Sequence, residues 1–183
     1  MAKLNSLGIS TAKSSVRTVG ASLGASFWSQ VQLGIIISFI LMGFVVFIMF
    51  RTFVPSLAVI IAAVSDIIET LAFMQIFGIN MSFASFAALL MLIGYSVDTD
   101  ILQTTRVLKD QAPLKDKVRR GLGTGLTMTF TTIGALTVLV ISSINPVLTE
   151  IASVLLIGLV FDMINTWIQN TGILVFYAEK KGL

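Results

Sequence analysis

The stretch Met91–Lys109 reads M-L-I-G-Y-S-V-D-T-D-I-L-Q-T-T-R-V-L-K and carries two carboxylates within an apolar run that begins near Met81. The run meets its first cation only at Arg106, after Asp98 and Asp100. A charge near the middle of a bilayer costs roughly 3 kcal/mol or more, so acids kept there are functional candidates by default. The stretch therefore predicts a membrane-spanning helix with a functional polar group.

The composition supports a membrane protein. The chain has 183 residues, 56% hydrophobic and 11% charged, whereas a soluble domain carries about 25% charged residues. The net charge of +3 is spread over connections, so we expect no nucleic-acid partner. Without Cys there is no thiolate metal site, and without His only carboxylates remain to titrate. We expect no metal and no cofactor.

Five long apolar stretches predict an all-α polytopic membrane helix bundle. About twenty helical residues cross the roughly 30 Å hydrocarbon core. Asn145-Pro146 has the cap-then-proline pattern of a helix start, and the one strongly polar loop is predicted over 106–120. The predicted bundle, 28–177, is followed by a tail at 178–183. The predicted spans are 31–50, 56–77, 81–105, 122–142 and 147–176.

The cations predict an orientation. Nine of them fall on one side of the predicted bundle and three, all before residue 18, fall on the other. The positive-inside rule places the nine in the cytoplasm. We therefore expect a multi-pass cell-membrane protein with its N-terminus outside and its C-terminus inside.

Three acids at similar depth on three different spans form the main candidate site. Asp66 and Asp162 lie near the centres of their spans, and Asp98 lies slightly cytoplasmic of the centre of its own. These acids are candidates for an ion or proton relay. The alternative is that each only hydrogen-bonds a neighbouring helix and holds the bundle together.

Two further acids accompany them. Asp100 is about 200° around the helix from Asp98 and nearer the cytoplasm, so we expect Asp98 to be the deeper group. Glu69 lies on the face of Asp66 and is either a relay partner or a group that reaches water. Thr127 and Thr131, at helical spacing on the fourth span, are candidates to donate hydrogen bonds to the acids.

Several motifs identify a resemblance. The chain reads R-T-F-V-P-S-L-A at 51–58, S-D at 65–66, G-Y-S-V-D-T-D at 94–100 and N-P-V-L-T-E-I-A at 145–152. These motifs resemble the archaeal-type SecF family over about residues 19–177. SecF is a membrane subunit that works with SecD beside the protein-export channel.

The resemblance implies six transmembrane helices in the resistance-nodulation-division (RND) arrangement, with a large external domain between the first two. The five predicted spans would be helices two to six, half of an RND-type transmembrane domain. Residues 1–27 would be the end of the external domain, which implies that a first helix and most of that domain are missing. The implied partners are SecD, the Sec channel, secreted polypeptides and the lipid bilayer.

In bacterial members, proton flow through acids of the fourth helix is thought to drive late steps of export. This chain departs from them in two places. The bacterial acid aligns with Thr99, and a bacterial arginine aligns with Met128. Thr99 and Tyr95, which lies on the same side of the helix as Asp98, are candidates for a supporting polar face. The acids would thus be protonated, bind a cation such as Na⁺, or meet a basic residue of SecD, since burial disfavours the charged form.

The leading interpretation is an accessory translocase subunit, not an enzyme, coupled to proton or Na⁺ flow. The alternative is a passive module that holds SecD and the channel together without ion transport. An intramembrane aspartyl protease is disfavoured because the approach to Asp98 is Gly-Tyr-Ser-Val, without the Gly-x-Gly-Asp signature.

Overall fold

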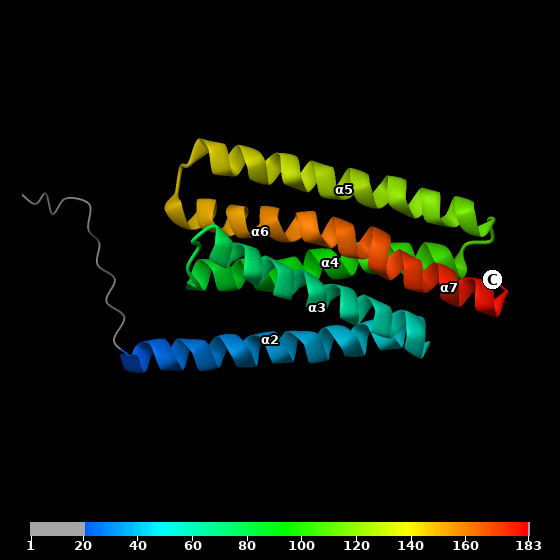
Figure 1. Ribbon diagram of the computed structural model, residues 1–183, viewed down its shortest axis with the longest axis horizontal. Helices are drawn as coiled ribbons and strands as arrows, with labels where there is room; N and C mark the ends of the chain where they lie inside the picture. The colour runs from blue at the N-terminus through cyan, green and yellow to red at the C-terminus, as the bar shows by residue number, and fades with distance from the viewer. Residues whose placement is uncertain (1–20, 183) are drawn as a thin grey trace, which may run out of the picture. The chain divides into compact units, whose positions relative to one another are not determined.

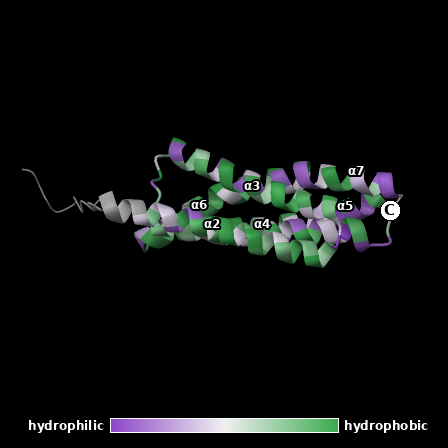
Figure 2. Ribbon diagram, turned by 90° about the horizontal axis from the view of Figure 1, so that it is seen from below, coloured by the Kyte–Doolittle hydropathy of each residue, from purple (hydrophilic) through white to green (hydrophobic). Residues whose placement is uncertain are grey.

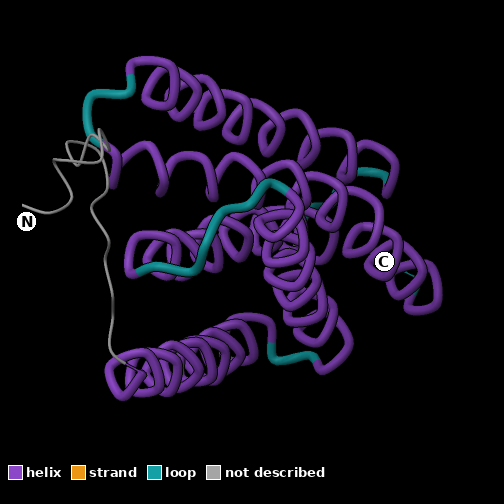
Figure 3. Tube along the Cα trace, turned by 60° about the vertical axis from the view of Figure 1, so that its left-hand side comes forward, coloured by secondary structure: helices purple, strands orange, loops and turns teal. Residues whose placement is uncertain are grey.

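A computed structural model describes residues 21–182, and every regular element in that range is a helix (Figure 3). Five of the helical segments are long and apolar enough to cross a membrane, which confirms the predicted all-α bundle. Of the predicted lead-in 1–27, residues 1–20 lie outside the described part, and the rest begins a helix. The elements are α2 (Ala21–Phe50), α3 (Phe53–Ile76), α4 (Phe83–Lys109), α5 (Leu114–Ser142), α6 (Pro146–Ile164), the π-helix η2 (Asn165–Asn170) and α7 (Thr171–Lys181).

The bundle lies within one compact unit that begins at Ile35. The helices α3, α4, α5 and α6 of this unit alternate in direction, and α7 continues the direction of α6 through η2 (Figure 1). The α3–α4 and α5–α6 connections lie at one end, and the α4–α5 connection and the end of α7 lie at the other. The described cations gather near this second end: Arg51, Arg106, Lys109, Lys115, Lys117, Arg119, Arg120, Lys180 and Lys181.

The outer surface is strongly apolar, and hydrophobic residues cover much of the ribbon in Figure 2. Ile40 and Ile141 are 65% and 77% exposed. Side chains of this kind on the outside are expected where the solvent is lipid. Inside, Val59 of α3, Leu92 of α4 and Leu155 of α6 belong to one buried apolar cluster.

Local sequence explains where two of these helices begin. The side chain of Ser82 accepts hydrogen bonds from the backbone N–H groups of Ala84 and Ser85, and it thereby caps α4. Asn145 caps α6 by accepting from the N–H of Val147 at 2.8 Å, with Pro146 in the first turn. The cap-then-proline start predicted for the last span is confirmed.

The prediction of a polar loop over 106–120 is wrong, because most of this segment is helical. Helix α4 continues to Lys109 and α5 already begins at Leu114, so only 110–113 connect them. Charge alone does not end a helix, because Lys and Arg are good helix formers and extend their charged ends to water. The same continuity applies at the C-terminus, where α7 runs to Lys181 through most of the predicted tail.

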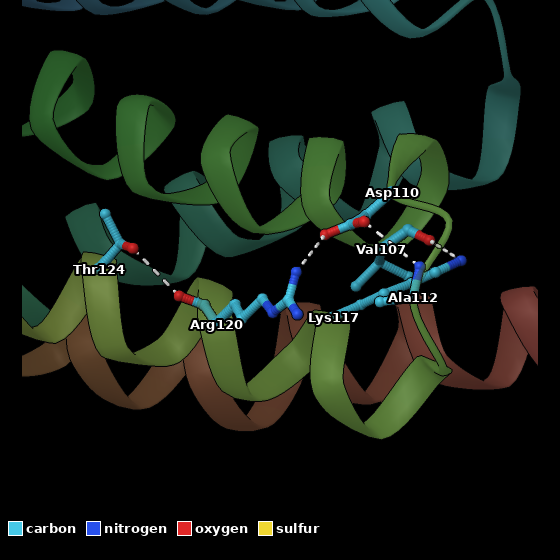
Figure 4. A network of polar contacts seen from close by, with 6 residues as sticks. All are labelled: Val107, Asp110, Ala112, Lys117, Arg120 and Thr124. Carbon is cyan, nitrogen blue, oxygen red and sulfur yellow. Dashed lines mark hydrogen bonds and ion pairs between the residues drawn. The ribbon is translucent and has the colours of Figure 1, made fainter.

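Side chains close the α4–α5 connection (Figure 4). The Nζ atom of Lys117 donates to the carbonyl oxygen of Val107 at 3.4 Å, which places a positive charge at the C-terminal end of α4. Asp110 accepts from the N–H of Ala112 at 3.3 Å and pairs with Arg120 at 3.9 Å. The end of the bundle that carries the cations is therefore bound together by its own charged residues.

Candidate functional site: a buried acid–amide centre

Three carboxylates are buried in one polar network inside the bundle. Asp66 of α3, Asp100 of α4 and Asp162 of α6 are all 1% exposed or less. They come from three different helices and are joined by polar side chains of η2. This set of side chains, together with Glu69, Ser96, Asn165, Thr166 and Asn170, is called the acid–amide centre below.

One half of the centre surrounds Asp66. The hydroxyl of Ser96 on α4 donates to Asp66 Oδ2, and Asn165 Nδ2 donates to Asp66 Oδ1 at 2.8 Å. The same Asn165 amide donates to Glu69 Oε2 at 2.9 Å. Asn165 therefore connects two carboxylates that lie one helical turn apart on α3.

The other half surrounds Asp100. Its Oδ1 atom accepts from Thr166 Oγ1 at 2.9 Å and from Asn170 Nδ2 at 2.7 Å. Thr166 Oγ1 also lies 3.3 Å from Asp162 Oδ1. A hydroxyl has a single proton to donate, so Thr166 is shared between two carboxylates of different helices. The consecutive residues Asn165 and Thr166 link the two halves.

The π-helix aligns the polar side chains of the last span. At 3.6 residues per turn, residues five apart diverge by about 140°. A π-turn bonds i to i+5 instead, and within η2 the buried Asn165 and Asn170 are five apart. The hydroxyl of Thr171 donates to the carbonyl oxygen of Thr166, again five residues back. The π-turn therefore allows both asparagines to face the bundle interior.

The centre contains negative and neutral groups but no basic side chain. Within residues 21–182 the one ion pair is Arg120–Asp110, outside the centre. Asp100 Oδ2, Asp162 Oδ2 and Asn170 Oδ1 are buried without a hydrogen-bond partner. Unsatisfied buried acceptors are costly, so the centre has unused capacity for a proton or a cation.

Asp98 lies elsewhere, and the expectation that it is the deeper acid is wrong. Asp98 is exposed on the outside of the bundle, whereas Asp100 is fully buried. The two acids do occupy different faces of α4, as predicted from their spacing. The error came from ranking the acids by distance from the cytoplasm, whereas rotation about the helix axis decides which one faces the interior. Tyr95 is also outside, 40% exposed.

The predicted supporting threonines do not contact the acid–amide centre. Thr127 and Thr131 are exposed and donate to backbone carbonyls of their own helix, those of Gly123 and Thr127. Thr99 is 6% exposed but donates to the carbonyl of Tyr95 at 3.0 Å. A threonine hydroxyl in a helix often bonds the carbonyl four residues back, which leaves it no proton for an acid.

Four residues of the centre were not predicted: Ser96, Asn165, Thr166 and Asn170. A signal was present in the sequence. After Ser153 the last span is apolar up to Asp162, and several uncharged polar residues follow that acid. Polar groups inside a membrane span face the bundle interior. These uncharged residues were not predicted because only the carboxylates of the span were considered as site residues.

Five membrane-length helices, three of which contribute acids to a buried polar centre, define a multi-pass membrane protein. A family model described as "Protein export membrane protein SecD/SecF, C-terminal" matches residues 1–180. The chain belongs to the SecD/SecF family of protein-export membrane proteins.

Individual relatives agree with this family. The chain is 46% identical to "Protein-export membrane protein SecF" of Methanolacinia petrolearia over 167 residues, which cover 90% of this chain and 59% of that protein. It is 46% identical to the protein of the same name from Methanocaldococcus jannaschii over 172 residues, 91% of this chain and 61% of that protein. It is 47% identical to the protein of the same name from Pyrococcus furiosus over 164 residues, which cover 89% of this chain and 55% of that protein. The chain thus spans between 55% and 61% of the length of these relatives.

Proposed function

We propose that this chain acts as a SecF-type subunit of the Sec export machinery. It works with SecD to promote late steps of polypeptide translocation, without catalytic activity of its own. The family match and the relatives named as SecF support this role. The distribution of cations supports an orientation with the C-terminus of α7 in the cytoplasm.

We further propose that export is coupled to ion movement through the acid–amide centre. The observation that carries this proposal is the burial of Asp66, Asp100 and Asp162 on three helices with no basic side chain among them. Helices that each contribute one acid to a shared centre respond together when the charge of that centre changes. Binding or release of a cation would thereby shift the packing of α3, α4 and α6.

A proton is the simplest ion for this site. Within the described range no three acidic side chains gather closely enough to hold a metal ion. A proton needs only one carboxylate oxygen and one acceptor, and Asp100 Oδ2 and Asn170 Oδ1 are both unpartnered. Na⁺ would need more oxygens drawn together, and it remains the second candidate ion for the experiment below.

The test is gradient-driven export in vesicles that hold this chain with SecD and the channel. Asp100→Asn removes the charge and keeps the size, so we expect the gradient-dependent part of export to be lost at normal complex yield. Asp98→Asn is the matched control, because it makes the same chemical change two residues away on the exposed face. Imposing a proton gradient or a Na⁺ gradient separately identifies the ion. Normal gradient-dependent export by Asp100→Asn would eliminate the coupling role.

Asp98 has a different proposed role, at the contact with SecD. An exposed carboxylate at membrane depth is too costly to face lipid, and Asp98 lies on the same outer side of α4 as Tyr95 and Met91. An uncharged hydrogen-bond donor of SecD would cover it. Asp98→Leu should then reduce the yield of the complex with SecD, while Asp98→Asn should retain it.

The alternative function is a passive assembly module. Its supporting observation is that the acids accept hydrogen bonds from other helices, as polar groups that hold helices together do. In that case Asp100→Asn would leave export normal, because an amide still bonds its neighbours, whereas Asp100→Leu would lower the yield of folded protein. The two substitutions together separate coupling from assembly.

A further inference from the structure

A groove of about 410 Å³ lies at the cation-rich end of the bundle, away from the acid–amide centre. Val54 of α3 and five residues of α7 line it: Ile173, Phe176, Tyr177, Lys180 and Lys181. The groove is thus apolar along one part and carries two ammonium groups and a phenol at the other. None of its lining residues is acidic.

The charges at the groove are not neutralised within the described residues. Lys180 and Lys181 are exposed and take part in no ion pair there. Helix α3 begins beside the groove, and its N-cap residue Thr52 makes no side-chain capping bond. Free N–H groups and the positive end of the helix dipole favour an anion at such a terminus. The lysines and the helix end therefore add positive potential on two sides of one groove.

The apolar wall is exposed on the outside of the bundle. Phe176 is 70% exposed and Val54 is 42% exposed, and both lie within helices of membrane-spanning length. A ligand that fits must combine a negative head at the interface with a long apolar chain. A soluble anion would leave the apolar wall unused, and a neutral lipid would leave the lysines without a counter-charge.

We propose that this groove binds an anionic phospholipid. The phosphate lies between the two lysine ammonium groups and the start of α3, Tyr177 donates a hydrogen bond to the headgroup, and one acyl or isoprenoid chain lies along Val54, Ile173 and Phe176. Basic pockets between transmembrane helices at the membrane surface recognise lipid heads in this way. The lipid would join α7 to α3 at the cation-rich end of the bundle.

The test measures binding of phosphatidylglycerol to the purified full chain in detergent, by native mass spectrometry. Lys180→Gln with Lys181→Gln should weaken binding about 30-fold, since each lysine beside an anionic lipid is worth about 1 kcal/mol and 1.4 kcal/mol is tenfold. Lys115→Gln with Arg119→Gln is the matched control, because it removes two exposed cations from the same end of the bundle outside the groove. This control should bind almost normally.

A second variant tests the groove itself. Ile173→Trp keeps both lysines and fills the apolar part, so it should also lower affinity for phosphatidylglycerol. Phosphatidylcholine and inorganic phosphate should bind far more weakly than phosphatidylglycerol. Equal loss in the control double variant would show general charge attraction and overturn the assignment. Full competition by inorganic phosphate would reduce the groove to a simple anion site and would overturn it as well.

Discussion

The Nδ2 atom of Asn170 donates a 2.7 Å hydrogen bond to Oδ1 of Asp100, a residue that lies on another helix and 70 positions earlier in the chain. The bond joins η2 to α4 at full burial, with both side chains 0% exposed. It exists because a π-turn directs Asn170 inward. This single contact connects the π-helix of the last span to a fully buried acid of α4.

Replacing Asn170 with Leu should therefore destabilise the bundle. Asp100 would keep only Thr166 as a donor, and removing one partner of a buried polar pair costs about 1–3 kcal/mol. The measurement is the free energy of unfolding in detergent. Asn80→Leu is the control, because Asn80 is exposed in the α3–α4 connection. A loss for Asn170→Leu no larger than that of the control would show that the contact carries no stability.

The sequence was sufficient to predict the class of fold, because hydropathy reports the free-energy cost of placing polar residues in lipid, which dominates in a membrane. Lipid requires about twenty apolar residues per crossing, and all five predicted spans correspond to helices. Polarity was less informative about helix ends. The charged segment 106–120 is mostly helical, since the chain leaves the hydrocarbon without leaving the helix.

The acid–amide centre could be predicted only in part. Asp66 and Asp162 lie inside as expected, but Asp98 does not. The polar residues that share a face of α4 with Asp100, Ser96 and Gln103 among them, did point to the interior face. Hydropathy cannot reveal the π-turn. Gln169 and Asn170 lie four and five residues after Asn165 and are equally polar, so the sequence does not show which of them shares a face with Asn165. The burial of both Asn165 and Asn170 on one face of the last span could therefore be seen only in the structure.

Close helix packing provides a prediction independent of the acids. A Cβ atom on Gly158 of α6 would overlap the side chain of Leu92 on α4, which is fully buried and cannot move away freely. Gly158→Ala should lose about 1–3 kcal/mol of stability by overpacking. Gly172→Ala, where nothing lies within 4 Å of the added atom, should be neutral or slightly stabilising. Chemical unfolding of both variants checks this, and equal stabilities would contradict the packing.

The stability that the α4–α5 connection contributes should depend on pH through Asp110. The N–H of Ala112 donates to this carboxylate, and this bond, with Arg120 and Arg106 nearby, lowers the pKa of Asp110 below its usual range. A carboxyl group with a lowered pKa in the folded state stabilises the fold at pH values above its pKa in the unfolded state. This stabilisation is lost as the pH falls through the pKa of the folded state. The stability difference between the natural chain and Asp110→Asn should be constant above about pH 5 and shrink below about pH 4. Thermal unfolding from pH 2.5 to 6 measures it, and a difference that grows on acidification would contradict the assignment.

The last prediction separates stability from function at Asp100. Its Oδ2 atom is buried without a partner and no cation lies beside it within residues 21–182, so a charge at this position works against folding. Asp100→Asn removes that charge and leaves an amide oxygen for Thr166 and Asn170, and we therefore expect an unfolding free energy equal to or above that of the natural chain. Asp98→Asn, on the exposed face, should change stability less. Functional residues commonly reduce stability, so a more stable variant without gradient-driven export would identify Asp100 as an acid retained for coupling. If Asp100→Asn instead keeps normal gradient-driven export, the carboxylate is a structural group and the passive module becomes the better account.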